Sequence, residues 1–139
     1  MVPLIDTHQH LIYREKAVYD WTKEIPLLAV DNFTIENYKV LTNNLGILGS
    51  LFMETGVNDS DYQNEALFVK NITDNIENNI LGMITSIRPE NDLEFDDWLD
   101  KTSDMGVLGY RRILHVMPDD ISQNNNFRNN VRKIGKKDK

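Results

Sequence analysis

The stretch VPLIDTHQH, residues 2–10, joins a short apolar run to a pair of histidines. The run Val2 to Ile5 has the length and composition of a buried strand. In extended backbone His8 and His10 point to the same side, about 6 to 7 Å apart along the chain, so both imidazoles can reach one ion. For a His-x-His pattern alone, two surface histidines are the commoner interpretation. Its place at the end of an N-terminal strand favours a pair of metal ligands instead.

Outward from this stretch, strand-like runs alternate with helix-like patterns. The further strands are predicted at Ile47 to Met53, Ile80 to Ile87 and Val107 to Leu114. The first helix is expected from an N-cap at Thr34 to Gly46, with Ile35, Tyr38, Leu41 and Leu45 as its apolar stripe. The second has Phe68, Val69, Ile72 and Ile76 on its apolar face. The third starts from a cap at Asp92 and buries Phe95, Trp98 and Leu99, and the fourth starts near Phe127 with Val131 and Ile134 as its apolar positions. This alternation is typical of parallel βαβ units. We therefore predict an α/β fold with parallel strands in the order 1-2-3-4.

The period of two along each strand assigns side chains to faces. On the second strand Ser50, Phe52 and Glu54 are predicted to share one face, and on the third Gly82, Ile84, Ser86 and Arg88 do so. On the fourth strand Gly109, Arg111, Ile113 and His115 share one face, whereas Tyr110 and Arg112 lie on the other, toward the helices. Each strand thus ends with a polar residue at its C-terminal edge, where parallel α/β folds place their chemistry. The loop from Leu11 to Phe33 is expected to pack on that mouth.

Composition excludes several functional classes. The net charge of -7 argues against a nucleic-acid partner, and the basic residues Arg132, Lys133, Lys136, Lys137 and Lys139 are interpreted as a solvated tail. The chain has no cysteine, so a disulfide framework, a thiolate zinc site and a cysteine nucleophile are excluded. No apolar run has the length of a membrane span or a secretory leader, which predicts a cytoplasmic protein.

The residues Ile5 to His10 resemble the first strand of the amidohydrolase superfamily, and in particular its lactonase-like, amidohydrolase-related branch. Further matches in the order of that branch are Trp21, Phe52-Met53-Glu54, Glu65, Arg88-Pro89 and Gly109-Tyr110-Arg111-Arg112-Ile113-Leu114-His115. The resemblance covers nearly the whole chain. It implies that residues 1–139 form the N-terminal half of a TIM (β/α)8 barrel, with about four βα units.

The resemblance also implies roles for individual residues. His8 and His10 would be metal ligands, with zinc as the first candidate, although some lactonase-like relatives keep such histidines without an obligatory metal. Arg111 would bind a substrate carboxylate or polarise the carbonyl, or else bridge loops as a structural residue. Arg88 and His115 would line the same mouth as further catalytic candidates. Trp21 and Glu54 would contact the substrate, or Glu54 would be a charge partner for these cations rather than a catalyst. Independently of the resemblance, the position of Asp6 two residues before His8 predicts that it orients an imidazole or caps a turn.

The implied reaction is the hydrolysis of a lactone, from a sugar acid or a dicarboxylate, by water attack on the ring carbonyl. The family's later histidine ligands and its aspartate base have no counterpart here, since His115 is the one other histidine. We therefore expect a truncated or frameshifted fragment that is inactive alone and self-associates through open edges. A non-catalytic half-barrel or binding scaffold is the alternative. An open flavodoxin-like sheet is less supported, because no glycine-rich phosphate loop follows the first strand.

Overall fold

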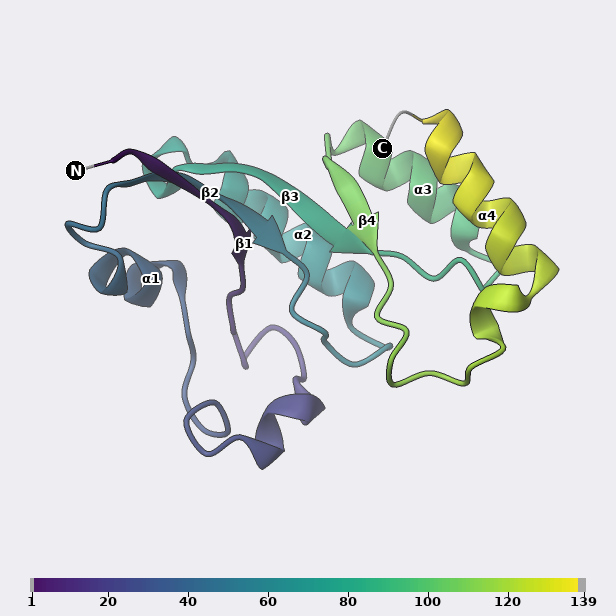
Figure 1. Ribbon diagram of the computed structural model, residues 1–139, viewed down its shortest axis with the longest axis horizontal. Helices are drawn as coiled ribbons and strands as arrows, with labels where there is room; N and C mark the ends of the chain where they lie inside the picture. Colours follow the sequence, from purple (N-terminus) through teal and green to yellow (C-terminus); the bar gives the residue numbers. More distant parts are fainter. Residues whose placement is uncertain (1, 138–139) are drawn as a thin grey trace.

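Residues 2–137, the part that this computed structural model describes, form one parallel sheet of four strands in the order β1-β2-β3-β4. The strands are β1 (Leu4–Gln9), β2 (Ile47–Met53), β3 (Ile80–Ser86) and β4 (Gly109–Arg111). All three neighbouring pairs are parallel. The predicted strand order and fold class are confirmed, and Figure 1 shows the strands curving side by side in chain order.

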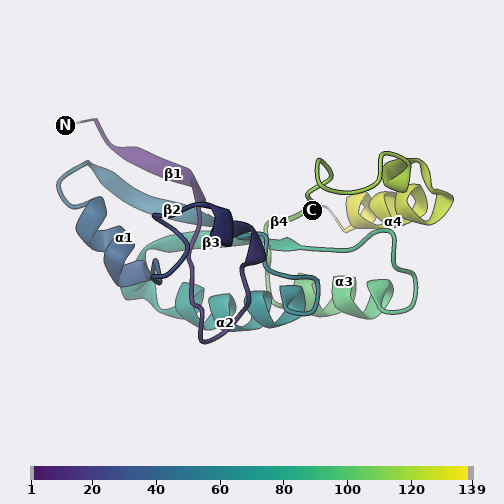
Figure 2. The ribbon, with the colours of Figure 1, turned by 90° about the horizontal axis from the view of Figure 1, so that it is seen from below.

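Each strand is followed by a helix, as a half-barrel requires. The α-helices are α1 (Ile35–Leu41), α2 (Tyr62–Asp74), α3 (Phe95–Asp104) and α4 (Asn125–Lys136), and short 3-10 helices lie at η1 (Asp20–Glu24), η2 (Ile76–Asn78) and η3 (Ile121–Gln123). In Figure 2, α2 and α3 lie below the sheet, with α1 and α4 toward its two ends. The opposite face of the sheet has no helical layer over it within residues 2–137.

The start of α1 follows the sequence, whereas its end does not. Thr34 is the N-cap, and its hydroxyl accepts from the Asn37 N–H while the Asn37 side chain accepts from the Thr34 N–H. The predicted extension to Gly46 is wrong, because the helix ends at Leu41. Asn44 has a φ of 63° and Gly46 a φ of 79°, so this stretch turns directly into β2.

Other boundaries also differ from the prediction. β1 begins at Leu4 and includes His8, and β4 is shorter than the apolar run from Val107 to Leu114 because its last residues leave the ladder after Arg111. The expected cap of α3 at Asp92 is wrong, since Glu94 holds the N-cap position and Asp92 accepts from Asn130 of α4. Ile76 lies in η2 and is 83% exposed, so it is not part of the buried face of α2.

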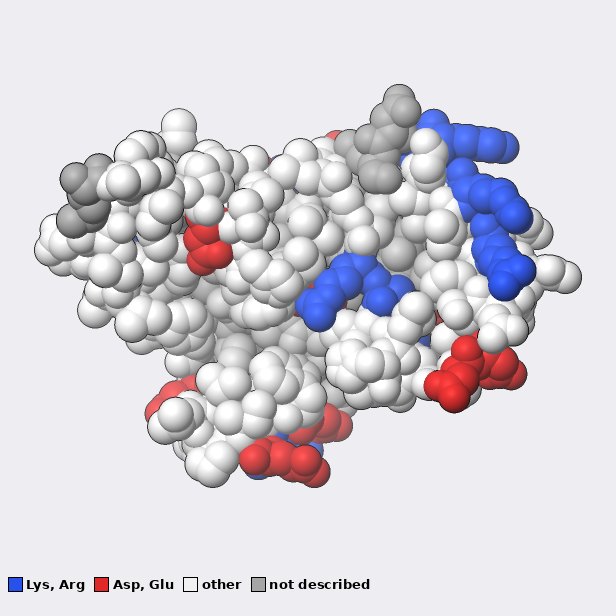
Figure 3. Space-filling model, in the orientation of Figure 1, with Lys and Arg blue, Asp and Glu red and all other residues white. Residues whose placement is uncertain are grey.

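The basic residues near the C-terminus belong to α4 and its cap rather than to a solvated tail. Lys133 Nζ lies 2.7 Å from Asp96 Oδ1 and Lys137 Nζ lies 2.8 Å from Asp100 Oδ1, so both residues fasten α4 to α3. Lys139 lies outside the described residues. Basic side chains form a stripe over this end of the molecule in Figure 3. No helix within residues 2–137 is both long enough and apolar enough to cross a bilayer.

The core lies between the sheet and the α2–α3 layer. Trp98 is 3% exposed and donates from its indole nitrogen to the Ser86 carbonyl at 3.1 Å. The Tyr110 hydroxyl lies 2.8 Å from the Thr102 hydroxyl of α3. Tyr110 therefore faces the helices, as predicted. Arg111, the next residue along β4, projects to the open side of the sheet.

Candidate functional site

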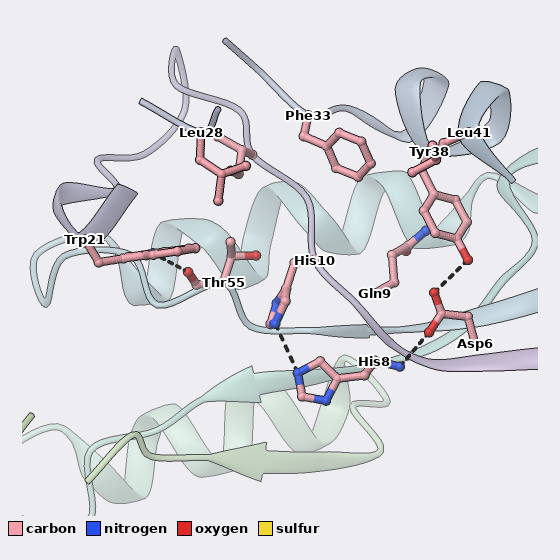
Figure 4. Close-up of a pocket in the computed structure, with 11 residues that line it drawn as sticks. Asp6, His8, Gln9, His10, Trp21, Leu28, Phe33, Tyr38, Leu41 and Thr55 are labelled. Carbon is pink, nitrogen blue, oxygen red and sulfur yellow. Dashed lines mark hydrogen bonds between the residues drawn. The ribbon is translucent and has the colours of Figure 1, made fainter. Parts of the chain in front are cut away.

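The two histidines of the opening stretch meet at the C-terminal end of β1. The Nε2 atoms of His8 and His10 are 3.0 Å apart, and the rings are nearly perpendicular. His10 Nδ1 lies 3.0 Å from the Met53 carbonyl, to which it can only donate. In the neutral ring this bond leaves the His10 Nε2 lone pair directed at His8. Figure 4 shows the two rings converging below β1.

Asp6 supports the backbone of this pair rather than a ring. Its Oδ1 accepts from the His8 N–H at 3.0 Å, and its Oδ2 accepts from the Tyr38 hydroxyl of α1 at 2.8 Å. Of the two roles considered for Asp6, the contacts match the turn cap. The sequence pattern places Tyr38 on the apolar stripe of its helix. Its hydroxyl, which carries the contact to the site, was missed because helical periodicity reports only on the ring.

Arg111 reaches the site from β4 and forms an ion pair with a buried carboxylate. Arg111 Nη1 lies 3.0 Å from Glu54 Oε1, and the Arg111 side chain is 32% exposed whereas that of Glu54 is 1% exposed. The other carboxylate oxygen of Glu54 accepts from the Ser86 hydroxyl at 2.8 Å and from the Gly56 N–H at 2.9 Å. Glu54 therefore holds the guanidinium in place while leaving part of it open to solvent.

The predicted common face of Phe52 and Glu54 is wrong. Phe52 pairs with Met83 in the core layer, whereas Glu54 contacts Ser86 and Arg111 on the open side. The alternation of faces breaks because β2 ends at Met53. A period of two holds only within the regular strand.

Four of the predicted residues line one cavity of about 300 Å³, namely His10, Trp21, Arg111 and His115. Trp21 is fixed over this cavity by a 2.8 Å hydrogen bond from its indole nitrogen to the Thr55 carbonyl. His8 lines an adjoining cavity of about 290 Å³, to which His10 and Trp21 also belong. The long first loop and the C-terminal strand edge thus line two adjoining cavities, which share His10, Trp21 and Thr55.

Arg88 does not line this cavity but a neighbouring one of about 340 Å³, which shares Gly56 and Ile113 with it. Its Nε and Nη2 contact Asp59 Oδ1 at 2.8 and 2.7 Å, and its guanidinium lies over the Tyr62 ring at 4.5 Å. Arg112 pairs with Glu90 and Asp59 in the same network, in agreement with a salt-bridge role. Asp59 was not singled out in the sequence, because a lone aspartate in a loop has no pattern that predicts its partner.

Charge and burial shift the titration of two groups near the site. Burial lowers the pKa of His10 from its usual value, and the neighbouring His8 and Arg111 lower it further, against the opposing effect of the Met53 carbonyl. Burial raises the pKa of Glu65 on α2 to about 8, and the nearby Glu54 charge adds to the rise. Glu65 is 1% exposed, and its Oε1 accepts from the Thr55 N–H at 3.0 Å. A neutral acid therefore supports the loop under the cavity at pH 7.

The histidine pair fits two ligands of a metal ion. A tetrahedral ion with nitrogens at 2.0–2.1 Å holds two of them about 3.3 Å apart, close to the observed separation. The bond from His10 Nδ1 to a carbonyl is the outer contact that ligating imidazoles usually have. Within residues 2–137, no three His, Cys, Asp or Glu side chains gather around one point. The described residues therefore provide part of a ligand set rather than a complete one.

Comparison with solved structures shows the same fold. An amidohydrolase 2 from Bifidobacterium longum subsp. infantis superposes with a TM-score of 0.67 and 18% identity, covering 99% of this chain and 49% of the other. A probable 2-pyrone-4,6-dicarboxylic acid hydrolase from Acinetobacter baumannii, with citric acid bound, gives a TM-score of 0.68 and 14% identity, covering 98% and 47%. The chain spans about half the length of these proteins. Neither a family model nor a curated protein matches its sequence.

Proposed function

We propose that this chain supplies the N-terminal half of the active site of an amidohydrolase-type hydrolase that opens a lactone ring. The observation that carries the proposal is the pairing of His8 and His10 at a strand end, in contact with the cavity that Arg111 lines. The likeness in fold to amidohydrolase 2 proteins supports it. So does the citric acid bound to one of them, because a carboxylate ligand suits a site that contains an open arginine.

In this proposal His8 and His10 hold a divalent cation, with zinc as the first candidate. When bound, such an ion would polarise the carbonyl and lower the pKa of water. Met53 keeps the His10 ring in the tautomer that presents Nε2. Arg111 binds a carboxylate of a sugar-acid or dicarboxylate lactone, or the oxyanion that forms during attack. Glu54 orients Arg111 through their ion pair, and Trp21 forms an apolar wall beside it.

A second candidate function is a half-barrel that binds a ligand without turnover. One observation favours it: within residues 2–137 no third ligand gathers beside the histidine pair. A catalytic zinc generally has three protein ligands and an open position. A monomer of this chain is therefore expected to bind metal weakly and to hydrolyse lactones no faster than buffer does.

The two functions are separated by measuring metal binding and turnover on the same preparations. Calorimetric titration with Zn²⁺ is expected to show weak binding that His10→Ala removes, while Arg88→Ala, outside the cavity, keeps it. A longer polypeptide that contains this segment and completes the barrel is expected to hydrolyse sugar-acid or dicarboxylate lactones. In that polypeptide Arg111→Ala is expected to lower kcat/KM by about 10²- to 10³-fold, in line with loss of one oxyanion donor.

Two results would count against the hydrolase. One is a completed barrel that releases no acid from any lactone in a panel followed by pH-stat. The other is full activity in the His10→Ala variant. Zn²⁺ binding with no turnover in the completed barrel would leave the binding scaffold as the better account.

A further inference from the structure

The sheet ends in two open edges that are complementary to each other. Within residues 2–137, β1 has β2 as its neighbour and β4 has β3, and each has a free side. The free N–H and C=O groups of an edge strand form a template for another strand. Because all four strands are parallel, a second copy can be placed by a twofold rotation about an axis that runs along the strand direction. This rotation brings β4 of each copy beside β1 of the other.

The β1 edge contains a buried amide without a partner. Gln9 is 2% exposed, yet neither its Nε2 nor its Oε1 has a hydrogen-bond partner. It lines the cavity of about 290 Å³ together with Leu28, Phe33, Tyr38 and Leu41. Buried amides are normally bonded, because leaving one unpaired costs free energy. The single chain already covers this amide, so Gln9 is an unpaired buried group beside the β1 edge rather than an open contact for a partner.

The β4 edge carries an apolar groove of matching character. A cavity of about 410 Å³ lies between β4 and α4, lined by Ile84, Tyr110, Phe127, Val131 and neighbouring residues. Val131 remains 44% exposed there, although it lies on the apolar stripe of α4. Figure 3 shows that the face over the sheet is largely uncharged apart from a basic group near its middle and an acidic group on the β1–β2 side. Low charge is typical of the centre of a stable interface.

The exposed surface is larger than a compact monomer needs. A folded monomer of 16.1 kDa is expected to expose about 7,400 Å², whereas this chain exposes 8437 Å². The excess is about 1,000 Å² per chain, or about 2,000 Å² for a pair, which is the size of a stable protein interface.

We propose that two copies of this chain associate about a twofold axis, each β4 pairing with β1 of the other copy, to close an eight-stranded parallel barrel. This proposal concerns assembly and does not depend on the proposed activity. It also brings the histidine pair of the second copy to the same mouth, since its β1 takes the fifth position in the barrel.

Barrel closure fixes the register of the new strand pair. Gln9, Phe52 and Met83 lie in one row across the sheet, and Leu108 continues it because Ile84 pairs with Gly109. In an eight-stranded barrel with a shear number of about 8, a row of paired residues returns to its first strand about eight residues away from where it started. Over half the circumference, the row is therefore displaced by about four residues along the strand. The row drops toward the N-terminal ends of successive strands. Because β1 shifts its register between Asp6 and Gln9, Leu108 meets the Leu4–Ile5 segment of the second copy. The side chains of Leu108 and Ile5 are 53% and 47% exposed in the single chain.

Light scattering after size exclusion is expected to give twice the 16.1 kDa of the chain. Ile5→Lys is expected to return the protein to a monomer, because a lysine on an edge strand blocks pairing. Val40→Lys, at a 79% exposed position on α1, should leave the dimer intact. A wild-type chain that is monomeric, or that forms open-ended oligomers, at micromolar concentration would overturn the proposal.

A cross-linking measurement keeps the test independent of misfolding in Ile5→Lys. The chain has no cysteine, so Ile5→Cys with Leu108→Cys should give an oxidised covalent dimer, because adjacent strands lie within disulfide reach. Ile5→Cys with Val40→Cys should not, and equal cross-linking of both pairs would contradict the register.

Discussion

Replacing Glu65 by glutamine is expected to stabilise the protein at neutral pH. The carboxyl group is 1% exposed, its Oε1 accepts from the Thr55 N–H, and its Oε2 has no partner. Burial, with help from the Glu54 charge, raises the pKa of Glu65 from 4.5 to about 8. The folded protein therefore keeps a proton that the unfolded chain releases. Glutamine retains the shape and the acceptor oxygen of the neutral acid, and it has no proton that the unfolded chain can release.

The sign and size of the effect follow from linkage. A raised folded-state pKa gives stability that is complete below the unfolded pKa of 4.5 and is lost as the pH rises toward 8. Between pH 5 and 7.5 the loss from this group is about 3 kcal/mol. Glu65→Gln should remove that loss, so its advantage over the wild type grows from less than about 1 kcal/mol at pH 5 to about 3–4 kcal/mol at pH 7.5.

Urea unfolding at both pH values, at one fixed protein concentration, measures this difference directly. Glu24→Gln changes an exposed glutamate and is the matched control, with an expected change within about 0.5 kcal/mol. An advantage of Glu65→Gln that is the same at pH 5 and pH 7.5, or a loss of stability at pH 7.5, would refute the assignment of a neutral buried acid.

Three further substitutions test contacts that hold the elements together, each measured by urea unfolding. Thr34→Ala removes the capping box of α1 and should cost about 1 kcal/mol; an unchanged midpoint would mean that the cap does not stabilise the helix. Thr102→Val removes the hydroxyl 2.8 Å from Tyr110 and should cost about 1–2 kcal/mol, with Thr102→Ser restoring most of it. Arg111→Met leaves Glu54 buried without its cation and should cost about 1–3 kcal/mol, allowing for the exposure of Arg111. Adding Glu54→Gln to Arg111→Met should recover most of that lost stability. If the changes in unfolding free energy of the two single variants simply added up in the double variant, Arg111 and Glu54 would not be coupled.

Local pattern was sufficient where neighbours in sequence decide the structure. The cap at Thr34 and the buried positions Trp98 and Leu99 follow from helical chemistry within a few residues. The run Ile47 to Met53 became β2 without change. The parallel order followed because alternating strands and helices leave few ways to connect.

Local pattern failed where an element ends or where a side chain meets a distant one. Glu54 left the face of Phe52 because β2 stops one residue earlier, and Asp92 bonds Asn130 of α4 instead of capping α3. The ion network of Arg88 with Asp59 joins residues 29 positions apart in the chain. No periodicity reports on such a contact.

The sequence by itself determined which residues form strands and helices, their parallel order, and the pairing of His8 with His10 on one side of β1. These features depend on backbone geometry and on the burial of apolar side chains within each βα unit. Only the tertiary structure decided that His10 binds the Met53 carbonyl, that Glu54 holds Arg111, and that Gln9 is buried without a partner. Those outcomes depend on how adjacent strands and loops pack in space, because burial and hydrogen bonding are set by neighbours that lie far apart in the chain.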